Sequence, residues 1–390
     1  MKLLTLSLSL IAASYAALPP RSSAQERKVG SGADRAGQST LSLESIAEAL
    51  DRPGAHDSFV PAAPLGITGD LGQWIPEDNP VTPAKVELGR QLFFDSRLSR
   101  DSSIACATCH DPAKGWTDSS PVSTGIDGEQ GDRSAPTVTN RLLGTTQFWD
   151  GRAASLEEQA LGPIGNPIEM GFSPEEAAER LESIPGYRIQ FRAVFGGPAT
   201  PDHIAKAIAT FERTLLSGAN ENDYYERAMP LFDWDPEDED DDDFRAQAER
   251  ILDQEAEHRM SAAAERGRGL FFGKASCSAC HVGHNLTDEE FHNIGTGIRD
   301  DGTVADRGRA SVTKREENRA AFKTPTMRDV ALTAPYMHDG SLATLKDVVE
   351  HYDRGGVPNP NLSDKIFPLK LSQEEKGDLV RFLKAVGHPP

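Results

Sequence analysis

The fold is decided by two short stretches, CATCH at residues 106–110 and CSACH at residues 277–281. In a C-x-x-C-H motif, both thiols form thioethers to one porphyrin and the adjacent histidine supplies the proximal nitrogen to its iron. A lone C-x-x-C pair is also typical of a redox dithiol or half a zinc site. Two copies, each followed directly by histidine, predict two covalently bound haem c groups. The predicted attachment residues and proximal ligands are Cys106, Cys109, His110, Cys277, Cys280 and His281.

The surroundings of the two motifs repeat as well. LGRQLFF at residues 88–94 precedes the first motif, and RGRGLFF at residues 266–272 precedes the second. An internal repeat of this kind indicates two related structural units. Alternating strand patterns are scarce, so the sequence predicts a mostly α protein with two cytochrome c-like haem domains in tandem and long loops.

The composition and the N-terminal residues limit the classes of protein to which this chain can belong. The 390 residues carry a net charge of −20, which argues against nucleic acid as a partner. Lys2 followed by an apolar run to Leu18 and then small residues is typical of a signal peptide over residues 1–24, and it indicates a periplasmic protein. The run is too short for a good membrane span, and no later stretch is long enough for one, so we expect a soluble mature chain.

We expect five regions along the chain. They are the signal peptide, a flexible segment at 25–60, an N-terminal haem domain at 61–226, an acidic connector at 227–260 and a C-terminal haem domain at 261–390. The run of acidic residues from Asp233 to Asp243 predicts a solvated, disordered loop. Helical patterns occur at 41–50, 83–94, 156–161, 174–182, 202–216, 261–272, 341–352 and 373–386.

The residues from Thr82 to Phe382 resemble the di-haem cytochrome c peroxidases, including their MauG-type branch. Several segments carry the resemblance in the same order and with the same gaps. They are the two haem motifs, QFWDGR at 147–152, GP at 162–163 through EM at 169–170, FHNIG at 291–295, FKTPT at 322–326 and APYMHDG at 334–340.

The resemblance implies that the first haem reacts with H₂O₂ on an open face. It places Glu169 and Gln159 over that face, with Pro163 nearby, and Trp149 between the two haems. A carboxylate there can move a proton from one peroxide oxygen to the other. Relatives that need reductive activation carry a loop histidine after the first motif, whereas no histidine follows His110 before position 203 here.

The sixth ligand of the second haem separates the branches of the family. The matching position, fourteen residues after His338, is Tyr352. A methionine there favours ferrous iron and a high potential, whereas a tyrosine oxygen is a hard donor that lowers the potential. Met327 and Met337 remain alternative ligands. His292, His338 and His351 are lesser rivals that we expect to pack or form hydrogen bonds.

The resemblance also implies a calcium ion between the domains. Its ligands would include backbone oxygens near Thr333 and Pro335. The family's asparagine ligand in the N-terminal domain corresponds to Ser134 here, which weakens the match.

These features favour an H₂O₂-dependent oxidoreductase. Its partner would be an electron-donor protein, a small cytochrome c or a copper protein, or a protein substrate as in MauG-type enzymes. Tyr352 and the missing loop histidine favour the MauG-type mechanism. The main alternative is a non-catalytic di-haem electron-transfer cytochrome c, which would need two six-coordinate irons. A haem-based redox sensor is a third class, without a receptor or kinase segment to support it.

Overall fold

The computed structural model describes residues 42–387 except 240 and 300. The described residues are mostly helical, with one antiparallel pair of short strands, β1 (Phe291–His292) and β2 (Phe322–Lys323). The prediction of a mostly α protein is therefore confirmed. The predicted signal peptide and residues 25–41 of the segment expected to be flexible lie outside the described residues. In the rest of that segment, residues 42–60, the structure has a helix at Leu43–Leu50.

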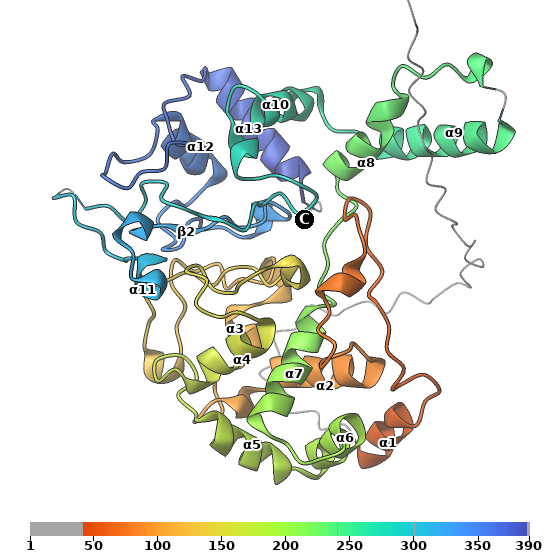
Figure 1. The fold of residues 1–390 in the computed structure, drawn as a ribbon, viewed down its shortest axis with the longest axis vertical. Helices are drawn as coiled ribbons and strands as arrows, with labels where there is room; N and C mark the ends of the chain where they lie inside the picture. Colours follow the sequence, from red (N-terminus) through yellow and green to blue (C-terminus); the bar gives the residue numbers. More distant parts are fainter. Residues whose placement is uncertain (1–41, 240, 300, 388–390) are drawn as a thin grey trace, which may run out of the picture. The chain divides into compact units, whose positions relative to one another are not determined.

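The helices fall into two lobes joined by a connector (Figure 1). The N-terminal lobe, residues 42–220, holds α1 (Leu43–Leu50), α2 (Pro83–Phe93), α3 (Cys106–Cys109), α4 (Leu156–Gly165), α5 (Pro174–Glu182), α6 (Pro185–Phe195) and α7 (Pro201–Glu212). The connector holds α8 (Glu221–Ala228) and α9 (Asp242–Glu257). The C-terminal lobe, residues 261–387, holds α10 (Ala262–Phe272), α11 (Ala310–Thr313), α12 (Leu345–Asp353) and α13 (Gln373–Ala385).

A closely packed helix pair forms the base of each lobe, α2 with α7 and α10 with α13. At each crossing a glycine allows the backbones to touch. A Cβ atom on Gly89 would overlap the carbonyl oxygen of Ala207, and one on Gly267 would overlap that of Asp378. Interiors this dense do not absorb an added methyl group without movement. The sequence repeat is therefore a structural repeat.

The aromatic residues of the repeat lie behind the proximal histidines. The Phe93 ring lies 5.3 Å from that of Phe211 and 6.4 Å from the His110 imidazole, measured between centroids. In the C-terminal lobe, Phe271 lies 5.1 Å from Phe382 and 6.3 Å from His281. The crossing helices thus place the Leu-Phe-Phe segments, 92–94 and 270–272, beside the haem motifs that follow them in the sequence.

The crossing in the C-terminal lobe offers a matched test of this packing. We expect Gly267→Ala to lower the free energy of unfolding by about 1–3 kcal/mol, because the new methyl group overlaps α13. Gly269, in the same helix, has no heavy atom within 4 Å of an added Cβ. Gly269→Ala should instead be neutral or stabilise by up to about 1 kcal/mol. Denaturant unfolding of both holo-proteins measures the difference; equal effects would contradict the close crossing.

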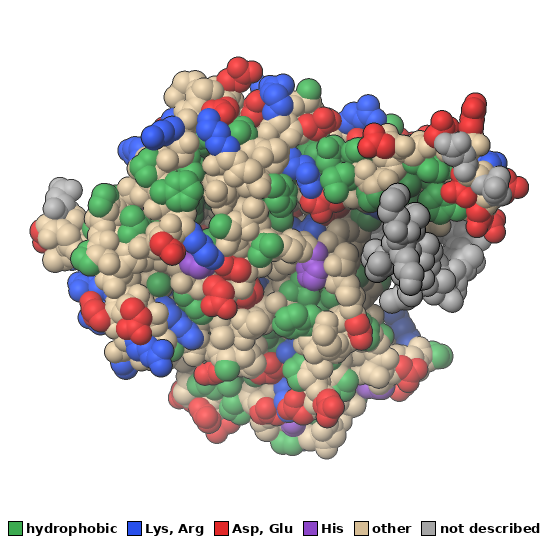
Figure 2. Space-filling view, turned by 45° about the horizontal axis from the view of Figure 1, so that its top comes forward, with side chains coloured by type: hydrophobic (Ala, Val, Ile, Leu, Met, Phe, Trp, Pro, Cys, Tyr) green, Lys and Arg blue, Asp and Glu red, His purple; other side chains and the backbone are tan. Residues whose placement is uncertain are grey.

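The acidic run, expected to be a loop, ends in a helix that the sequence did not predict. Its last two residues, Asp242 and Asp243, begin α9, because the Asp241 side chain accepts hydrogen bonds from the backbone N–H groups of Asp243 and Phe244 at 2.9 and 3.1 Å. Acidic side chains stabilise the first turn of a helix. Figure 2 shows red acidic side chains gathered at the upper right, over this connector, beside apolar ones. The sequence patterns also missed α6 and α8.

Candidate active site

One cavity of about 1080 Å³ is lined by residues of both lobes. Its volume exceeds the range of about 300–1,000 Å³ that is usual for a single small-molecule site. The walls include all six attachment residues and proximal ligands, and seven other residues that the sequence singled out for the haems. Those others are Trp149, Gln159, Pro163, Glu169, Met327, Met337 and Tyr352.

Both proximal histidines are held in the form that binds a metal. Nδ1 of His110 donates to the carbonyl of Trp116 at 3.2 Å, and Nδ1 of His281 donates to that of Leu286 at 3.1 Å. Burial lowers the pKa of both imidazoles, which keeps them neutral. Each histidine therefore keeps a free Nε2 lone pair, oriented by a backbone hydrogen bond of the kind that supports metal ligands.

The four cysteines fit covalent haem attachment. All lie in the described part of the chain, on the cavity wall, and none forms a disulfide. Burial raises the pKa of Cys109 to about 11 and that of Cys277 to about 12, so both are protonated at neutral pH. Two thiol pairs, each beside a histidine with a free Nε2, match the donor set of two haem c groups.

The segment after α4 fixes the orientation of Glu169. The Asn166 side-chain amide donates to Glu169 Oε1 at 2.6 Å, while its backbone carbonyl accepts from the Glu169 N–H at 3.1 Å. Gln159 and Pro163 lie one helical turn apart on α4 and line the same cavity. The sequence analysis missed Asn166, although an Asn-Pro pair signals the start of a turn.

The loop that follows the first haem motif packs against this distal segment. The Ile126 N–H donates to the carbonyl of Glu169 at 2.9 Å. A Cβ atom on Gly125 would overlap the carbonyl oxygen of Ile168, so the two backbones touch. The loop, which has no histidine, thus supports the Glu169 backbone.

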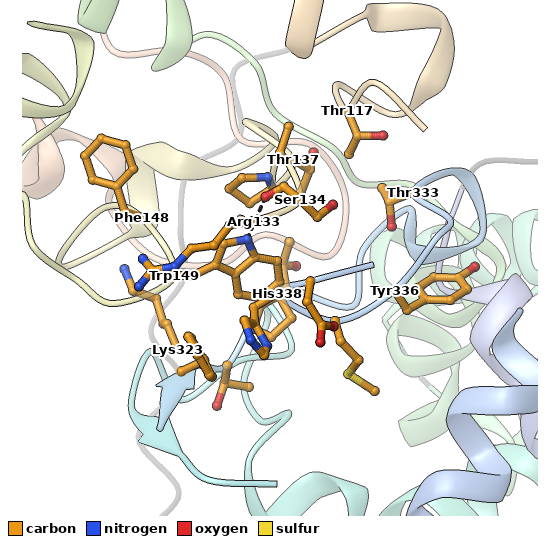
Figure 3. Close-up of a pocket in the computed structure, with 18 of the residues that line it drawn as sticks. Thr117, Arg133, Ser134, Thr137, Phe148, Trp149, Lys323, Thr333, Tyr336 and His338 are labelled. Atoms are coloured by element: carbon orange, nitrogen blue, oxygen red, sulfur yellow. Dashed lines mark hydrogen bonds between the residues drawn. The ribbon is translucent and has the colours of Figure 1, made fainter. Parts of the chain in front are cut away.

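Trp149 is held between the lobes (Figure 3). Its indole Nε1 donates to the carbonyl of Ser134 at 2.9 Å, and its own carbonyl accepts from the Lys323 N–H at 2.8 Å. The Ser134 N–H donates to the carbonyl of His338 at 2.7 Å, and the His338 ring stacks on Phe322 with centroids 3.6 Å apart. Backbone hydrogen bonds therefore fix the indole against both halves of the cavity.

Ion pairs across the lobes surround this contact. Arg141 of the N-terminal lobe pairs with Glu289 of the C-terminal lobe at 2.9 Å. Arg133 pairs with Asp306 at 2.6 Å and with Asp150, in its own lobe, at 2.7 Å. The sequence analysis did not single these residues out, because they lie in loops without a periodic pattern.

Tyr352, on α12, lies near the second pair of cysteines. It lines the cavity, and burial, together with the nearby thiols of Cys277 and Cys280, raises the pKa of its phenol. Met327 and Met337 line the same cavity, and Met327 is only 8% exposed, within the apolar core of the C-terminal lobe. The structure therefore brings all three candidates to one cavity.

The other histidines near the second site have partners of their own. His292 Nε2 lies 2.8 Å from a carboxylate oxygen of Asp288. His351 Nε2 donates to the carbonyl of Ile294 at 2.8 Å. With His338 stacked on Phe322, each of the three is engaged in packing or hydrogen bonding.

The residues considered for calcium, Ser134, Thr333 and Pro335, all line the cavity. The Ser134 carbonyl already accepts from the Trp149 indole. Within residues 42–387, the one group of His, Cys, Asp and Glu side chains close enough to hold a metal is Cys280, Asp288 and His292, which lies elsewhere. A calcium ion at Ser134 would therefore depend on backbone oxygens.

A cavity shared by two haem-binding lobes defines a di-haem c-type protein, and comparisons with known proteins specify the class. The family model described as di-haem cytochrome c peroxidase matches residues 83–229. The methylamine utilization protein MauG of Methylorubrum extorquens is 41% identical over 317 residues, 81% of each chain. The cytochrome c551 peroxidase of Pseudomonas aeruginosa is 37% identical over 276 residues, 69% of this chain and 72% of the relative.

A solved structure agrees with these sequence matches. A MauG-like protein associated with microbial copper homeostasis superposes with a TM-score of 0.68 at 29% identity, covering 86% of this chain and 95% of the other. The chain belongs to the di-haem cytochrome c peroxidase family, as the sequence predicted. It is an H₂O₂-dependent oxidoreductase with two haem c cofactors. Within the described residues, no helix is long and apolar enough to cross a membrane.

Proposed function

We propose that this chain is a periplasmic enzyme that consumes H₂O₂ at the haem of the N-terminal lobe and exchanges electrons through that of the C-terminal lobe. The observation that carries the proposal is the hydrogen bond from Asn166 to Glu169 on the wall of the cavity that His110 also lines. An oriented carboxylate beside an open metal site is what peroxide cleavage requires of a protein.

Glu169 moves the proton in this proposal. Asn166 holds Oε1, which leaves Oε2 as the base that accepts a proton from one oxygen of H₂O₂ and returns it to the other. The Gln159 amide orients the peroxide from α4. A haem held by Cys106, Cys109 and His110 would supply a redox-active iron and the electrons for peroxide reduction.

Trp149 and Tyr352 complete the proposed pathway. The half-buried indole, held by both lobes, provides the route for electrons between the two haem sites. Tyr352 would bind the iron of the second haem, and its hard oxygen would lower the potential. The electron donor is a small cytochrome c or a copper protein, or the partner is a protein substrate as for MauG-type enzymes. The proposal also includes a calcium ion bound near Thr333 and Pro335, and haem spectra recorded before and after chelation test it.

Rapid mixing of the ferric holo-protein with H₂O₂ tests the proposal. Because no loop histidine closes the first site, we expect the haem absorbance to change at once, without prior reduction. Turnover should follow when a one-electron donor is added. If H₂O₂ changes the haem absorbance neither before nor after partial reduction, the result would contradict the proposal and favour a non-catalytic electron carrier.

A further inference from the structure

A buried carboxyl group without a partner lies at the end of α7. Glu212 is 3% exposed and lines the haem cavity. Its Oε2 has no hydrogen-bond partner among the described residues. A buried carboxylate without a partner is costly, which favours the neutral acid. Burial raises the pKa of Glu212 to about 8.

The internal repeat shows that this acid is specific to the first haem site. In the N-terminal lobe, Phe211 packs on the LFF segment and Glu212 follows it. In the C-terminal lobe, Phe382 packs on the corresponding segment and Leu383 follows it. Both following residues line the cavity. At this equivalent position, the first haem site therefore has a carboxylic acid and the second has a hydrocarbon side chain.

The charged groups around Glu212 are engaged elsewhere. Arg213 pairs with Glu157 of α4 at 2.8 Å, and Arg141 pairs with Glu289. On α2, the buried ammonium of Lys85 is held by other hydrogen bonds, and α5 buries only alanine and leucine side chains. The two arginines favour ionisation of Glu212 and Glu157 opposes it.

The remaining neighbour of Glu212 is the first haem site itself. The Cys106 thiol of α3 is close enough to interact electrostatically with the Glu212 carboxyl, and the side chains line one cavity. Cys106 is an attachment residue for the first haem. The carboxyl therefore faces the cofactor whose charge changes during electron transfer.

We propose that Glu212 is a proton-exchanging residue of the first haem site. It takes up one proton from solvent, which forms its carboxyl O–H bond, when that haem accepts one electron from a donor. It releases the proton when the electron leaves. Ferric haem carries one more positive charge than ferrous haem, so it stabilises the carboxylate while ferrous haem favours the acid. This inference rests on the two haems of the family and not on the peroxide chemistry.

Spectroelectrochemical titration of the holo-protein over pH tests the inference. Where Glu212 is ionised in the ferric state and protonated in the ferrous state, the reduction equilibrium of the first haem should fall by up to tenfold per pH unit, about 59 mV. Glu212→Gln and Glu212→Leu, which copies the second site, should lose this slope. Leu383→Gln, the mirrored change in the other lobe, should keep it. Slopes unchanged in both Glu212 variants would overturn the inference and assign the protons to other groups.

Infrared difference spectra between the two redox states give a direct readout. We expect a carboxylic acid C=O band that appears on reduction of the first haem and is absent in Glu212→Gln. A band that persists in this variant would also overturn the inference. If both readouts hold but the wild type ignores H₂O₂, the peroxidase proposal fails and the proton exchange stands.

Discussion

Replacing Glu169 by glutamine is expected to slow the reaction of the ferric holo-protein with H₂O₂ by about 10²–10⁴-fold, the usual contribution of a positioned base. The amide keeps the volume of the side chain but cannot accept the peroxide proton. Stopped-flow absorbance at several H₂O₂ concentrations measures the second-order rate constant. The haem spectra before mixing should match the wild type, because the substitution changes neither proximal ligand.

Two further variants separate proton transfer from charge. Glu175→Gln removes the same charge at an exposed position of α5 and should leave the rate unchanged. Asn166→Leu removes the donor to Glu169 Oε1 and should produce a smaller loss than Glu169→Gln, since the base remains but is misoriented. A Glu169→Gln enzyme that reacts as fast as the wild type would remove this residue from the mechanism.

Replacing Tyr352 by methionine is expected to raise the reduction potential of the second haem by on the order of a few tenths of a volt. A thioether stabilises ferrous iron, whereas a tyrosine oxygen stabilises ferric iron, within a total axial-ligand span of about 0.8 V. Optical potentiometry of the low-spin haem measures the shift. The first haem should keep its reaction with H₂O₂ when the second is ferric.

The rival ligands provide the controls for this variant. Tyr336 lines the same cavity, and burial raises the pKa of its phenol to about 12, yet Tyr336→Phe should leave the potential unchanged. Met327→Leu should also leave the low-spin spectrum unchanged. A low-spin spectrum lost in Met327→Leu and retained in Tyr352→Met would show that the thioether is the ligand.

Much of the helical core could be predicted because its signals are local. Pro174–Glu182 begins with proline after a serine N-cap and ends where the structure ends α5. The LFF repeat predicted two related units, and the structure shows equivalent helix crossings in them at Gly89 and Gly267. In contrast, the sequence did not predict α9, because an acidic run is typical both of a solvated segment and of a helix N-terminus.

The residues of the candidate site also differ in whether a local sequence signal reveals them. The C-x-x-C-H motifs are contiguous, so their residues could be assigned from the sequence. Asn166 acts through a side-chain hydrogen bond, and Glu212 stands out only when its burial and the missing partner are visible. The pair between Arg141 and Glu289 joins residues far apart in the chain, and no local pattern predicts it.

Electron paramagnetic resonance of the ferric holo-protein, recorded before and after one equivalent of H₂O₂, tests the central claim most directly. An open first site and a Tyr352-ligated second site predict one high-spin and one low-spin ferric haem, with both signals lost promptly on mixing. Two low-spin haems that ignore H₂O₂, even after one-electron reduction, would contradict the peroxidase account and leave an electron carrier.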